Sequence, residues 1–339
     1  MRIGSWRRVH PRGSALAVLG GLVVGLAGCG TNAAGSEGRL QVVTTVSPIT
    51  SIAANVIGDK ADITGVVPEG TNSHTFEPPP SAAAVLSKAD VVLINGLKLE
   101  DPTRELAAQN KKDDAEVVEI GTTVLPESQW IYDFSFPEEE GKPNPHLWTD
   151  PLYAIKYADV IRDVMVRRDP GNKATYAANY QAFEHKATAL GHALEQDQET
   201  IPGGRRELLT YHDAYAYFAR DYGWRVIGAI QPENFEDPTP REVAALIDQV
   251  KREQVPTIFG SEVFPSKVLE QIGKETGARY EDTLRDDDLP GKPGEPEHSW
   301  LGLMRYDYRT MIRGLGGTSQ ALDALDTRDV APDKAAYPQ

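Results

Sequence analysis

The longest uninterrupted helical pattern in the chain is NKATYAANYQAFEHKATALGHALEQDQE, residues 172–199. Its apolar side chains recur at intervals of three and four residues, so one face of the helix is apolar along its whole length. These side chains are Tyr176, Tyr180, Phe183, Ala187, Leu190 and Leu194. At 1.5 Å per residue such a helix is roughly 40 Å long. It is therefore long enough to run between two lobes of one protein.

Strand and helix patterns alternate on both sides of this stretch. The apolar, β-branched runs that indicate strands are residues 40–46, 63–67, 91–94, 207–210, 224–230 and 257–259. Strands that alternate with helices form parallel sheets with helices on both faces. The predicted fold class is therefore α/β, with two lobes that each hold a central parallel sheet and one long rigid helix that joins them. The acidic, Pro/Gly-rich residues 281–297 are expected to form a loop.

These patterns also set the predicted domain boundaries. The N-terminal lobe covers residues 40–171, the linker helix 172–199 and the C-terminal lobe 200–317. A tether at residues 29–39 precedes the first lobe. Residues 318–339 are expected to form a loosely ordered tail.

Residues 1–28 have the pattern of an export signal. Four arginines precede an apolar run from Ala15 to Ala27, which is too short and too rich in glycine for a stable membrane span. The run closes in Leu26-Ala27-Gly28-Cys29, which looks like a bacterial lipobox, and Cys29 is the only cysteine. We therefore expect export, lipidation of Cys29 and anchoring to the outer face of the cell membrane. The alternative is an ordinary signal peptide in which the cysteine occurs by chance.

The charge of the chain limits the class of ligand. Its 339 residues include 35 Lys and Arg against 50 Asp and Glu, which gives a formal net charge of −15. Removal of the signal, with its four arginines and no acid, takes this charge to about −19. Such a balance argues against nucleic acid as a partner and is compatible with a cation.

Three histidines lie where α/β proteins bind ligands, beyond the carboxyl ends of predicted strands or in a rigid turn. They are His74, His146 and His212. His146 follows Pro143-Asn144-Pro145, and these prolines restrict the backbone so that the imidazole points in a fixed direction. The alternative for His146 is a loop histidine packed under Trp148. Because two of the three come from the first lobe and one from the second, a site that uses all of them lies between the lobes.

A fourth ligand from the second lobe would complete a tetrahedral metal site. The run Arg285-Asp286-Asp287-Asp288 offers carboxylates at about the right place. The simpler interpretation of such a run is a solvated acidic loop, which we expect for two of its three acids.

The remaining histidines are weaker candidates for metal ligands. His10 lies in the expected signal, and His185 and His192 lie off the apolar face of the long helix, so both are expected to be solvated. His298 begins the last predicted helix and is expected to be a cap or a surface group. The sequence contains no His-Glu-x-x-His pair, no phosphate-binding glycine loop and no Gly-x-Ser-x-Gly elbow.

Several segments together resemble a known family. They are His74-Thr75-Phe76-Glu77-Pro78-Pro79-Pro80-Ser81, Asn95-Gly96-Leu97-Lys98-Leu99-Glu100, Pro145-His146-Leu147-Trp148-Thr149-Asp150-Pro151 and His212-Asp213-Ala214-Tyr215-Ala216-Tyr217-Phe218. In this order they are similar to the zinc- and manganese-binding lipoproteins of bacterial ABC importers. The resemblance runs from about Leu40 to Leu315. It implies two α/β lobes joined by one long rigid helix, with a metal in the cleft between them.

The resemblance also implies the metal ligands. His74 and His146 match the ligands of the family's first lobe, and His212 matches the first ligand of the second lobe. The family's fourth ligand is the Asp of a Leu-x-x-Asp-x-Leu stretch, which points to Asp287 within residues 284–289. The two neighbouring aspartates, Asp286 and Asp288, are the alternatives.

Three further positions are compared with the family. Glu262 matches an acidic residue after a strand, and we expect it to support the site or the structure. Asn72-Ser73 stands where the family often has Asp-Pro or Asp-Ala, which is expected to alter the loop without removing the ligand. Many zinc-binding members carry a His-rich loop before the second histidine. Here Asp133 and residues 138–140, all Glu, take its place, and their hard oxygen ligands would collect zinc weakly.

The donor set suggests both a metal and a function. Three imidazoles and one carboxylate favour Zn²⁺, and Mn²⁺, which prefers more oxygen ligands, is the alternative. We expect a monomer, not an enzyme, that captures the ion as cargo and delivers it to an ABC importer permease with its cytoplasmic ATPase. The alternatives are a zinc-dependent hydrolase or hydratase, with water in the fourth position, and a surface adhesin whose metal is structural.

Overall fold

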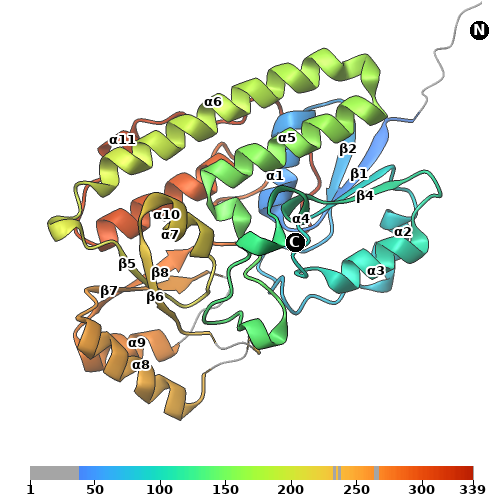
Figure 1. Cartoon of the computed structure of the whole chain (residues 1–339). Helices are drawn as coiled ribbons and strands as arrows, with labels where there is room; N and C mark the ends of the chain where they lie inside the picture. Colours follow the sequence, from blue (N-terminus) through green and yellow to red (C-terminus); the bar gives the residue numbers. More distant parts are fainter. Residues whose placement is uncertain (1–37, 232–233, 236–237, 263–266, 339) are drawn as a thin grey trace, which may run out of the picture. The chain divides into compact units, whose positions relative to one another are not determined.

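Two four-stranded parallel sheets organise the chain, as the computed structural model in Figure 1 shows. The structure describes residues 38–338 apart from 232–233, 236–237 and 263–266. The expected export signal, His10 and Cys29 therefore lie outside the described residues. Residues 39–339 form one compact unit by themselves.

The first sheet has the strand order β2-β1-β3-β4. Its strands are β1 (Leu40–Thr44), β2 (Ala61–Gly65), β3 (Val91–Ile94) and β4 (Glu116–Glu119). The helices that connect and follow them are α1 (Ser47–Ile57), α2 (Pro80–Leu86), α3 (Asp101–Asn110) and α4 (Ile120–Val124). All four residues of β3 are buried, as expected of a central strand covered on both faces.

The second sheet repeats this topology with the order β6-β5-β7-β8. Its strands are β5 (Glu207–Thr210), β6 (Arg225–Ala229), β7 (Thr257–Ser261) and β8 (Arg279–Leu284). Its helices are α7 (Ala216–Tyr222), α8 (Pro240–Glu253) and α9 (Lys267–Thr276). The prediction of a loop from residue 281 onward is wrong at its start, because β8 pairs with β7 there. An edge strand tolerates charged side chains, so acidic composition does not exclude a strand.

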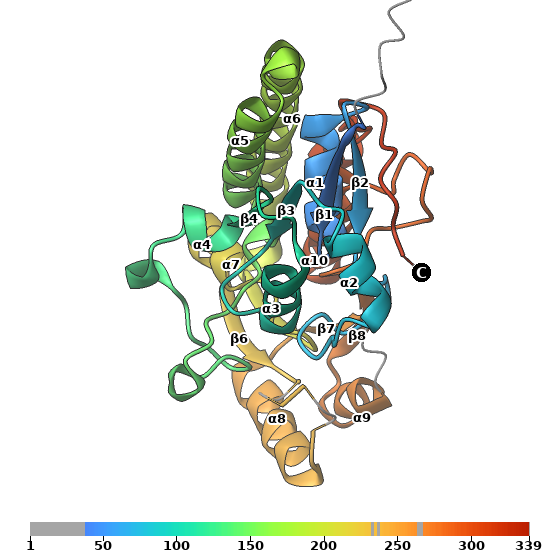
Figure 2. The same ribbon diagram turned by 90° about the vertical axis from the view of Figure 1, so that its right-hand side faces the viewer.

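The long helix is confirmed as α6 (Lys173–Gln198). It packs against α1 and α5 (Pro151–Arg168) of the first half, and against α10 (Trp300–Gly314) and α11 (Gln320–Asp323) near the C-terminus. Figures 1 and 2 show α6 lying alongside α5. Phe183 and Leu190 on its apolar face are fully buried, whereas His185 and His192 are exposed, as predicted. Neither α6 nor any other helix among the described residues is long and apolar enough to cross a membrane.

The apolar core has two parts. One continuous cluster runs from the first sheet through α5, α6 and α7 to α10. A second cluster lies between the second sheet and helices α8 and α9; it includes Leu209, Ile227, Ile258, Val243, Ile247, Leu269 and Ile272. The second sheet is therefore covered on both faces. The face that packs against α7 and α10 shares the larger core with the first half of the chain.

The C-terminal segment differs from its prediction as a loosely ordered tail. Leu322 is fully buried, and the segment continues back to the first sheet. There Ala336 pairs in parallel with Thr64 of β2: its N–H donates to the Ile63 carbonyl at 2.9 Å, and the Gly65 N–H donates to the Ala336 carbonyl at 2.9 Å. The free edge of β2 offers unpaired backbone groups, and the tail satisfies some of them.

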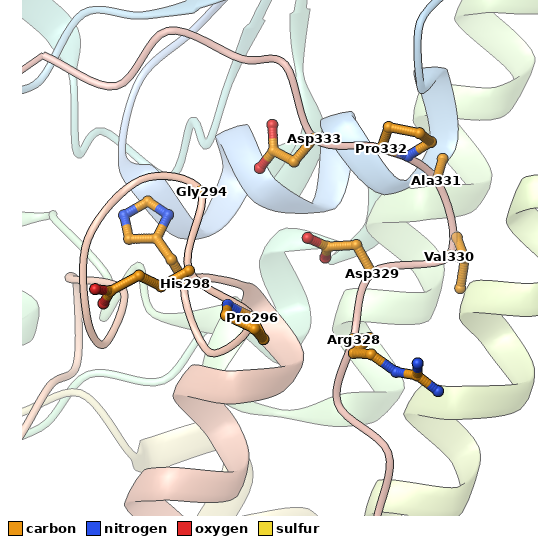
Figure 3. Close-up of a pocket in the computed structure, with 10 residues that line it drawn as sticks. Gly294, Pro296, His298, Arg328, Asp329, Val330, Ala331, Pro332 and Asp333 are labelled. Atoms are coloured by element: carbon orange, nitrogen blue, oxygen red, sulfur yellow. The ribbon is translucent and has the colours of Figure 1, made fainter.

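A pocket of 460 Å³ lies between this tail and the loop that precedes α10 (Figure 3). His298 is buried beside it, with Nε2 at 3.1 Å from Oε1 of Glu69. The cap of α10 is Ser299, whose Oγ accepts a hydrogen bond from the Gly302 N–H. His298 is thus neither the cap nor a surface group; it joins the second half to a loop of the first.

We predict that Phe183→Ala lowers the free energy of unfolding by about 3–5 kcal/mol, because truncation of a buried ring leaves a cavity. The Phe183 ring packs 5.4 Å from that of Trp300, between the long helix and α10. Chemical denaturation would measure the change. His185→Ala, two residues away on the exposed face, is the control and should change this free energy by less than about 0.5 kcal/mol. Equal effects of the two substitutions would contradict the role of α6 as the shared support of both halves.

Candidate metal centre

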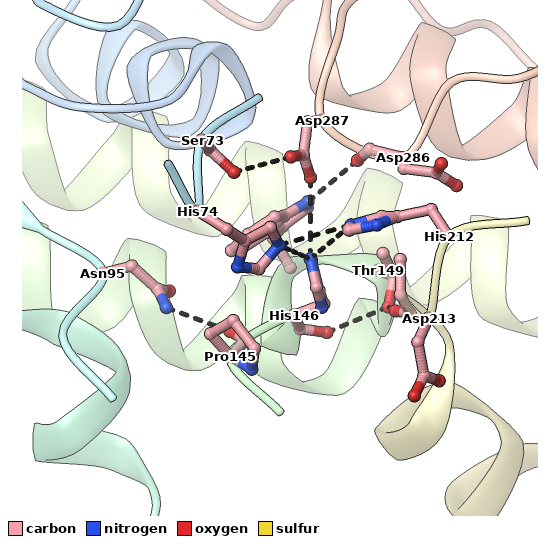
Figure 4. A network of polar contacts seen from close by, with 12 residues as sticks. Ser73, His74, Asn95, Pro145, His146, Thr149, His212, Asp213, Asp286 and Asp287 are labelled. Carbon is pink, nitrogen blue, oxygen red and sulfur yellow. Dashed lines mark hydrogen bonds and ion pairs between the residues drawn. The ribbon is translucent and has the colours of Figure 1, made fainter. Parts of the chain in front are cut away.

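Four side chains from four separate segments converge on one point (Figure 4). They are His74 between β2 and α2, His146 before α5, His212 after β5 and Asp287 after β8. One ligand atom of each lies within 4.8 Å of those of the other three. His146, His212 and Asp287 are buried, and His74 is partly exposed. The structure therefore brings together the four residues to which the sequence pointed, two from each half.

Local structure fixes the two fully buried histidines. His212 follows the end of β5, where the Thr210 hydroxyl donates to the His212 carbonyl at 2.6 Å. His146 precedes a short 3₁₀ turn, and the Thr149 hydroxyl donates to the His146 carbonyl at 3.0 Å. Asp150 then caps α5 by accepting a hydrogen bond from the Leu152 N–H. These hydrogen bonds fix the backbone from which each imidazole projects.

Two amide side chains determine which ring nitrogen carries the proton. Nδ1 of His146 lies 2.8 Å from Oδ1 of Asn144, and Nδ1 of His212 lies 2.7 Å from Oε1 of Gln231. The Asn144 amide is itself oriented by its NH₂ group, which donates to the Asp213 carbonyl at 2.8 Å. An amide oxygen only accepts, so Nδ1 is the donor in each ring and Nε2 keeps its lone pair. In both rings Nε2 is therefore the nitrogen that could bind a metal.

The spacing of the three Nε2 atoms suits one small cation. They lie 3.1 Å apart for His74 and His146, 3.4 Å for His74 and His212, and 2.9 Å for His146 and His212. A tetrahedral zinc ion with Zn–N distances of about 2.0–2.1 Å has nitrogen–nitrogen edges of about 3.3–3.4 Å. The observed spacing is equal to or slightly shorter than these edges, so a cation fits with little movement of the rings.

The carboxylate of Asp287 presents only one oxygen to this cluster. Oδ1 lies 3.8 Å from Nε2 of His146 and, among the described residues, accepts no hydrogen bond. Oδ2 accepts a hydrogen bond from the Ser73 hydroxyl at 2.7 Å. The backbone carbonyl of Asp287 accepts another from the Ser47 hydroxyl at 2.9 Å. Asp287 is therefore held with Oδ1, the oxygen without a hydrogen bond, toward the cluster.

Burial sets the protonation of the cluster. It lowers the pKa of His74 and of His146 well below the usual 6.5, and the neighbouring His212 lowers both further. These two imidazoles are therefore neutral near pH 7, as metal ligands must be. Burial raises the pKa of Asp287, while His212 and the Ser73 hydrogen bond lower it. A bound cation would favour the charged carboxylate still more.

The acidic run is not the solvated loop that we expected for two of its acids. Asp286, Asp287 and Asp288 are all buried. Oδ1 of Asp286 accepts from the Tyr215 hydroxyl at 2.7 Å, and Oδ2 of Asp288 accepts from the Gly70 N–H at 2.6 Å. The two alternative ligands are thus engaged elsewhere, and Asp287 alone of the three joins the group of possible metal ligands.

Residues of the first half hold this run in place. Besides Ser47, Ser73 and Gly70, the Trp148 indole donates to the Asp286 carbonyl at 2.9 Å. From the second half, Glu262 forms an ion pair with Arg285, with Oε2 and Nη1 2.6 Å apart. Glu262, matched to a supporting residue of the family, thus contacts the start of the run and not the cluster.

Aromatic rings cover the partly exposed histidine. Phe235 stacks on His74 with ring centroids 4.3 Å apart and planes at 4°, and Phe136 lies 5.4 Å away. A pocket of 240 Å³ adjoins His74 and is lined in part by both rings. The three glutamates 138–140 of the acidic loop are exposed, and Glu140 also lines this pocket. His74 is therefore the ligand nearest to solvent.

Sequence reasoning missed the residues that orient the ligands. Asn144 lies two residues before His146, inside a stretch that we had already singled out, so its amide was a detectable candidate. Ser73 was noted only as a departure from the family. Gln231 follows β6 with no local motif, and only the parallel pairing of β5 and β6 places it near His212.

Comparison with known proteins places these features in a family. Residues 42–314 match the family model of the zinc-uptake complex component A, periplasmic (ZnuA). The match spans both sheets, α6 and all four residues of the cluster.

Curated relatives extend over most of the chain. The iron-binding protein YfeA of Yersinia pestis is 32% identical over 279 residues, which cover 82% of this chain and 87% of YfeA. The manganese-binding lipoprotein MntA of Halalkalibacterium halodurans is 29% identical, with 85% and 94% covered. The metal ABC transporter substrate-binding lipoprotein SsaB of Streptococcus sanguinis is 27% identical, with 84% and 92% covered.

A solved structure shares the fold. The periplasmic zinc-binding protein TroA of Treponema pallidum superposes with a TM-score of 0.74 at 24% identity, covering 82% of this chain and 99% of TroA. This likeness supports two parallel sheets with one long helix and, at such identity, nothing finer. The family model and the relative with 32% identity go further, and together they show that the chain belongs to the ZnuA family of periplasmic metal-uptake proteins.

Proposed function

We propose that this protein captures Zn²⁺ outside the cytoplasm and delivers it as cargo to the permease of an ABC importer. The observation that carries the proposal is the convergence of His74, His146, His212 and Asp287, whose ligand atoms all lie within 4.8 Å of one another. The Nε2 atoms of His146 and His212 lie 2.9 Å apart, so one cation can contact both. Asp287 supplies a negative charge to the same point, as a divalent ion requires.

The donor set favours zinc over the other metals found among the relatives. YfeA is named for iron, MntA for manganese and TroA for zinc, so likeness alone does not decide the metal. Three imidazoles with a carboxylate that offers one oxygen make a four-coordinate shell, which suits zinc. Manganese prefers more oxygen ligands and a higher coordination number, and the Ser73 hydrogen bond withholds the second oxygen of Asp287.

The position of the ligands links binding to the arrangement of the halves. Each half contributes two ligands, so a bound ion joins them directly. The continuous α6 contacts both halves and resists wide bending, which favours a small closure. We infer that the permease recognises the closed arrangement and that opening releases the ion.

Location and partners follow from the same proposal. The lipobox at Leu26–Cys29 would attach the protein to the outer face of the membrane, beside its permease and the cytoplasmic ATPase. The names of MntA and SsaB, both lipoproteins, support this anchoring. The SsaB name also supports the ABC transporter as partner.

The site geometry also weighs against the enzyme alternative. Catalytic zinc sites keep an open position for water, whereas sites with four protein ligands are closed. Asp287 points its free oxygen at the fourth position, which supports binding over hydrolysis. If the protein were instead a surface adhesin, its metal would be structural and would exchange with metal in solution very slowly.

Removal of either second-half ligand should destroy tight zinc binding. In competition titrations of the metal-free protein, we expect one tight zinc site in the wild type. Asp287→Ala and His212→Ala should each weaken it by more than about a hundredfold, the upper range for residues that only support a ligand. Asp288→Asn, which changes the neighbouring acid, is the control and should weaken it by less than about tenfold. Tight binding of manganese with weak binding of zinc would contradict the choice of zinc as the metal. The absence of a tight site for either metal would contradict the proposed function.

Ser73→Ala should reduce the preference for zinc. Loss of the hydroxyl frees Oδ2 of Asp287 to bind the ion as a second oxygen, which favours manganese. We expect the ratio of zinc affinity to manganese affinity to fall by about tenfold, comparable to one hydrogen bond to a charged group of roughly 1.5 kcal/mol. The same titrations would measure it, with Ser73→Thr as the variant that keeps the hydroxyl. An unchanged ratio in Ser73→Ala would show that the Ser73 hydrogen bond to Asp287 does not set the selectivity.

A further inference from the structure

A strained turn follows the central strand of the first sheet. Gly96, Leu97 and Lys98 all have left-handed backbones, with φ of 77°, 51° and 64°. Such φ values are unfavourable for residues with a Cβ, and two of these three are not glycine. The turn belongs to the segment Asn95–Glu100, one of the motifs of the family resemblance, and none of its residues joins the metal cluster. Something in the surrounding structure must hold it.

The buried carboxylate of Glu100 holds this turn. Glu100 as a whole is 4% exposed. Oε1 accepts hydrogen bonds from the Thr45 hydroxyl at 2.6 Å and from the Asn95 N–H at 2.8 Å, and Oε2 accepts one from the Gly96 N–H at 3.0 Å. The donors lie just beyond the ends of β1 and β3, at the edge from which the ligand loops emerge. Glu100 therefore fixes both the entry to the turn and its distance from β1.

The side chain of Asn95 connects this turn to a metal ligand. Its NH₂ group donates to the Pro145 carbonyl at 2.9 Å, as Figure 4 shows, and its Oδ1 accepts from the Tyr157 hydroxyl at 2.5 Å. The Pro145 carbonyl belongs to the peptide bond that leads into His146. A hydrogen bond to that carbonyl restricts rotation of the peptide plane and hence the direction of the imidazole.

We propose that Glu100 is a positioning residue for the metal centre: its carboxylate holds the turn at residues 96–98 so that the Asn95 amide fixes the peptide before His146. The inference rests on the proposed function, because it concerns the orientation of one of the four ligands. It assigns a role in metal binding to a residue that contacts no ligand directly.

Burial makes the charged form of this carboxylate costly for stability. Burial raises the pKa of Glu100 from 4.5 to about 7, although the Thr45, Asn95 and Gly96 hydrogen bonds lower it. Tyr157 of α5 is a titratable group that faces it. Because the folded pKa is raised, the stability that Glu100 contributes is present in full below pH 4.5 and is lost as the pH rises through about 7. A buried ionisable group that lowers stability when it is charged is typical of functional sites.

The substitution Glu100→Gln tests whether Glu100 positions His146 or only stabilises the fold. The glutamine oxygen can still accept from Thr45 and Asn95, but its NH₂ group opposes the Gly96 N–H. At pH 8 we expect zinc affinity to fall by about tenfold, within the range for residues that orient a ligand.

The visible absorption of the Co²⁺-substituted Glu100→Gln protein should also change, because His146 is less well oriented. The melting temperature of the metal-free variant should not fall, because a buried charge has been removed. Between pH 8 and pH 6 the difference in affinity from the wild type should narrow, because Glu100 of the wild type becomes protonated.

Two further variants keep the test decisive. Asn95→Ala removes the bond to the Pro145 carbonyl and leaves Glu100 in place; it should give the same change in the Co²⁺ spectrum, even if Glu100→Gln does not fold. Asp197→Asn is the control, since this buried carboxylate on α6 accepts hydrogen bonds from the Ala321 and Leu322 N–H groups. It should lower the melting temperature and leave the affinity and spectrum unchanged.

The outcomes distinguish this inference from the proposed function. If Glu100→Gln and Asn95→Ala behave like Asp197→Asn, with lower melting temperatures and an unchanged Co²⁺ spectrum and zinc affinity, Glu100 is only structural and the inference is wrong. If the wild type itself binds neither Zn²⁺ nor Co²⁺ at the cluster, the proposed function is wrong, and the inference fails with it.

Discussion

The Nε2 atoms of His146 and His212 lie 2.9 Å apart in the interior of this protein, and the structure around them keeps them there. Each ring is committed through its other nitrogen, which donates to the amide oxygen of Asn144 or Gln231. Burial keeps His146 neutral by lowering its pKa. A cation at this point would contact both nitrogens, and the nearby carboxylate of Asp287 would balance part of its charge.

The repeated topology explains how the fold supplies these groups. Both sheets have the same strand order, and in each the ligand loops emerge beyond the carboxyl ends of parallel strands. The long helix α6 packs on both halves, which keeps the two sets of loops near each other. Hydrogen bonds from Ser47, Ser73 and Trp148 add a second connection, since all three lead from the first half to the acidic run of the second. Asp287 is thus placed by the half that does not contain it.

The sequence predicted the architecture well because its signals are local. The apolar stripe of α6 and the β-branched runs of both sheets depend only on residues close together in the chain. His74, His146 and His212 could be selected from their positions after strands or between prolines. The fourth ligand was different: spacing left three adjacent acids open, and only the family resemblance favoured Asp287.

What the sequence did not reveal depends on contacts across long distances. Gln231 becomes the partner of His212 through strand pairing, and Ser73 meets Asp287 across 214 positions of the chain. The acidic β8 was taken for loop because its charged residues lie on an edge strand, where charge is tolerated. The tail was taken for loose chain because its order comes from covering the edge of β2. The buried pair of His298 and Glu69 has the same origin, since it joins segments 229 residues apart.

The most direct test of zinc capture at this cluster is zinc K-edge X-ray absorption of the zinc-loaded protein, together with the metal content per chain. We predict one zinc per chain with four light ligands, three imidazole nitrogens and one carboxylate oxygen, at about 2.0–2.2 Å. Multiple-scattering features of imidazole should be strong and should decrease by about a third in His146→Ala, since one of three histidines is lost. A shell of five or six ligands, an imidazole signal that does not change in that variant, or no stoichiometric zinc would contradict the central claim that these three histidines and Asp287 together bind the ion.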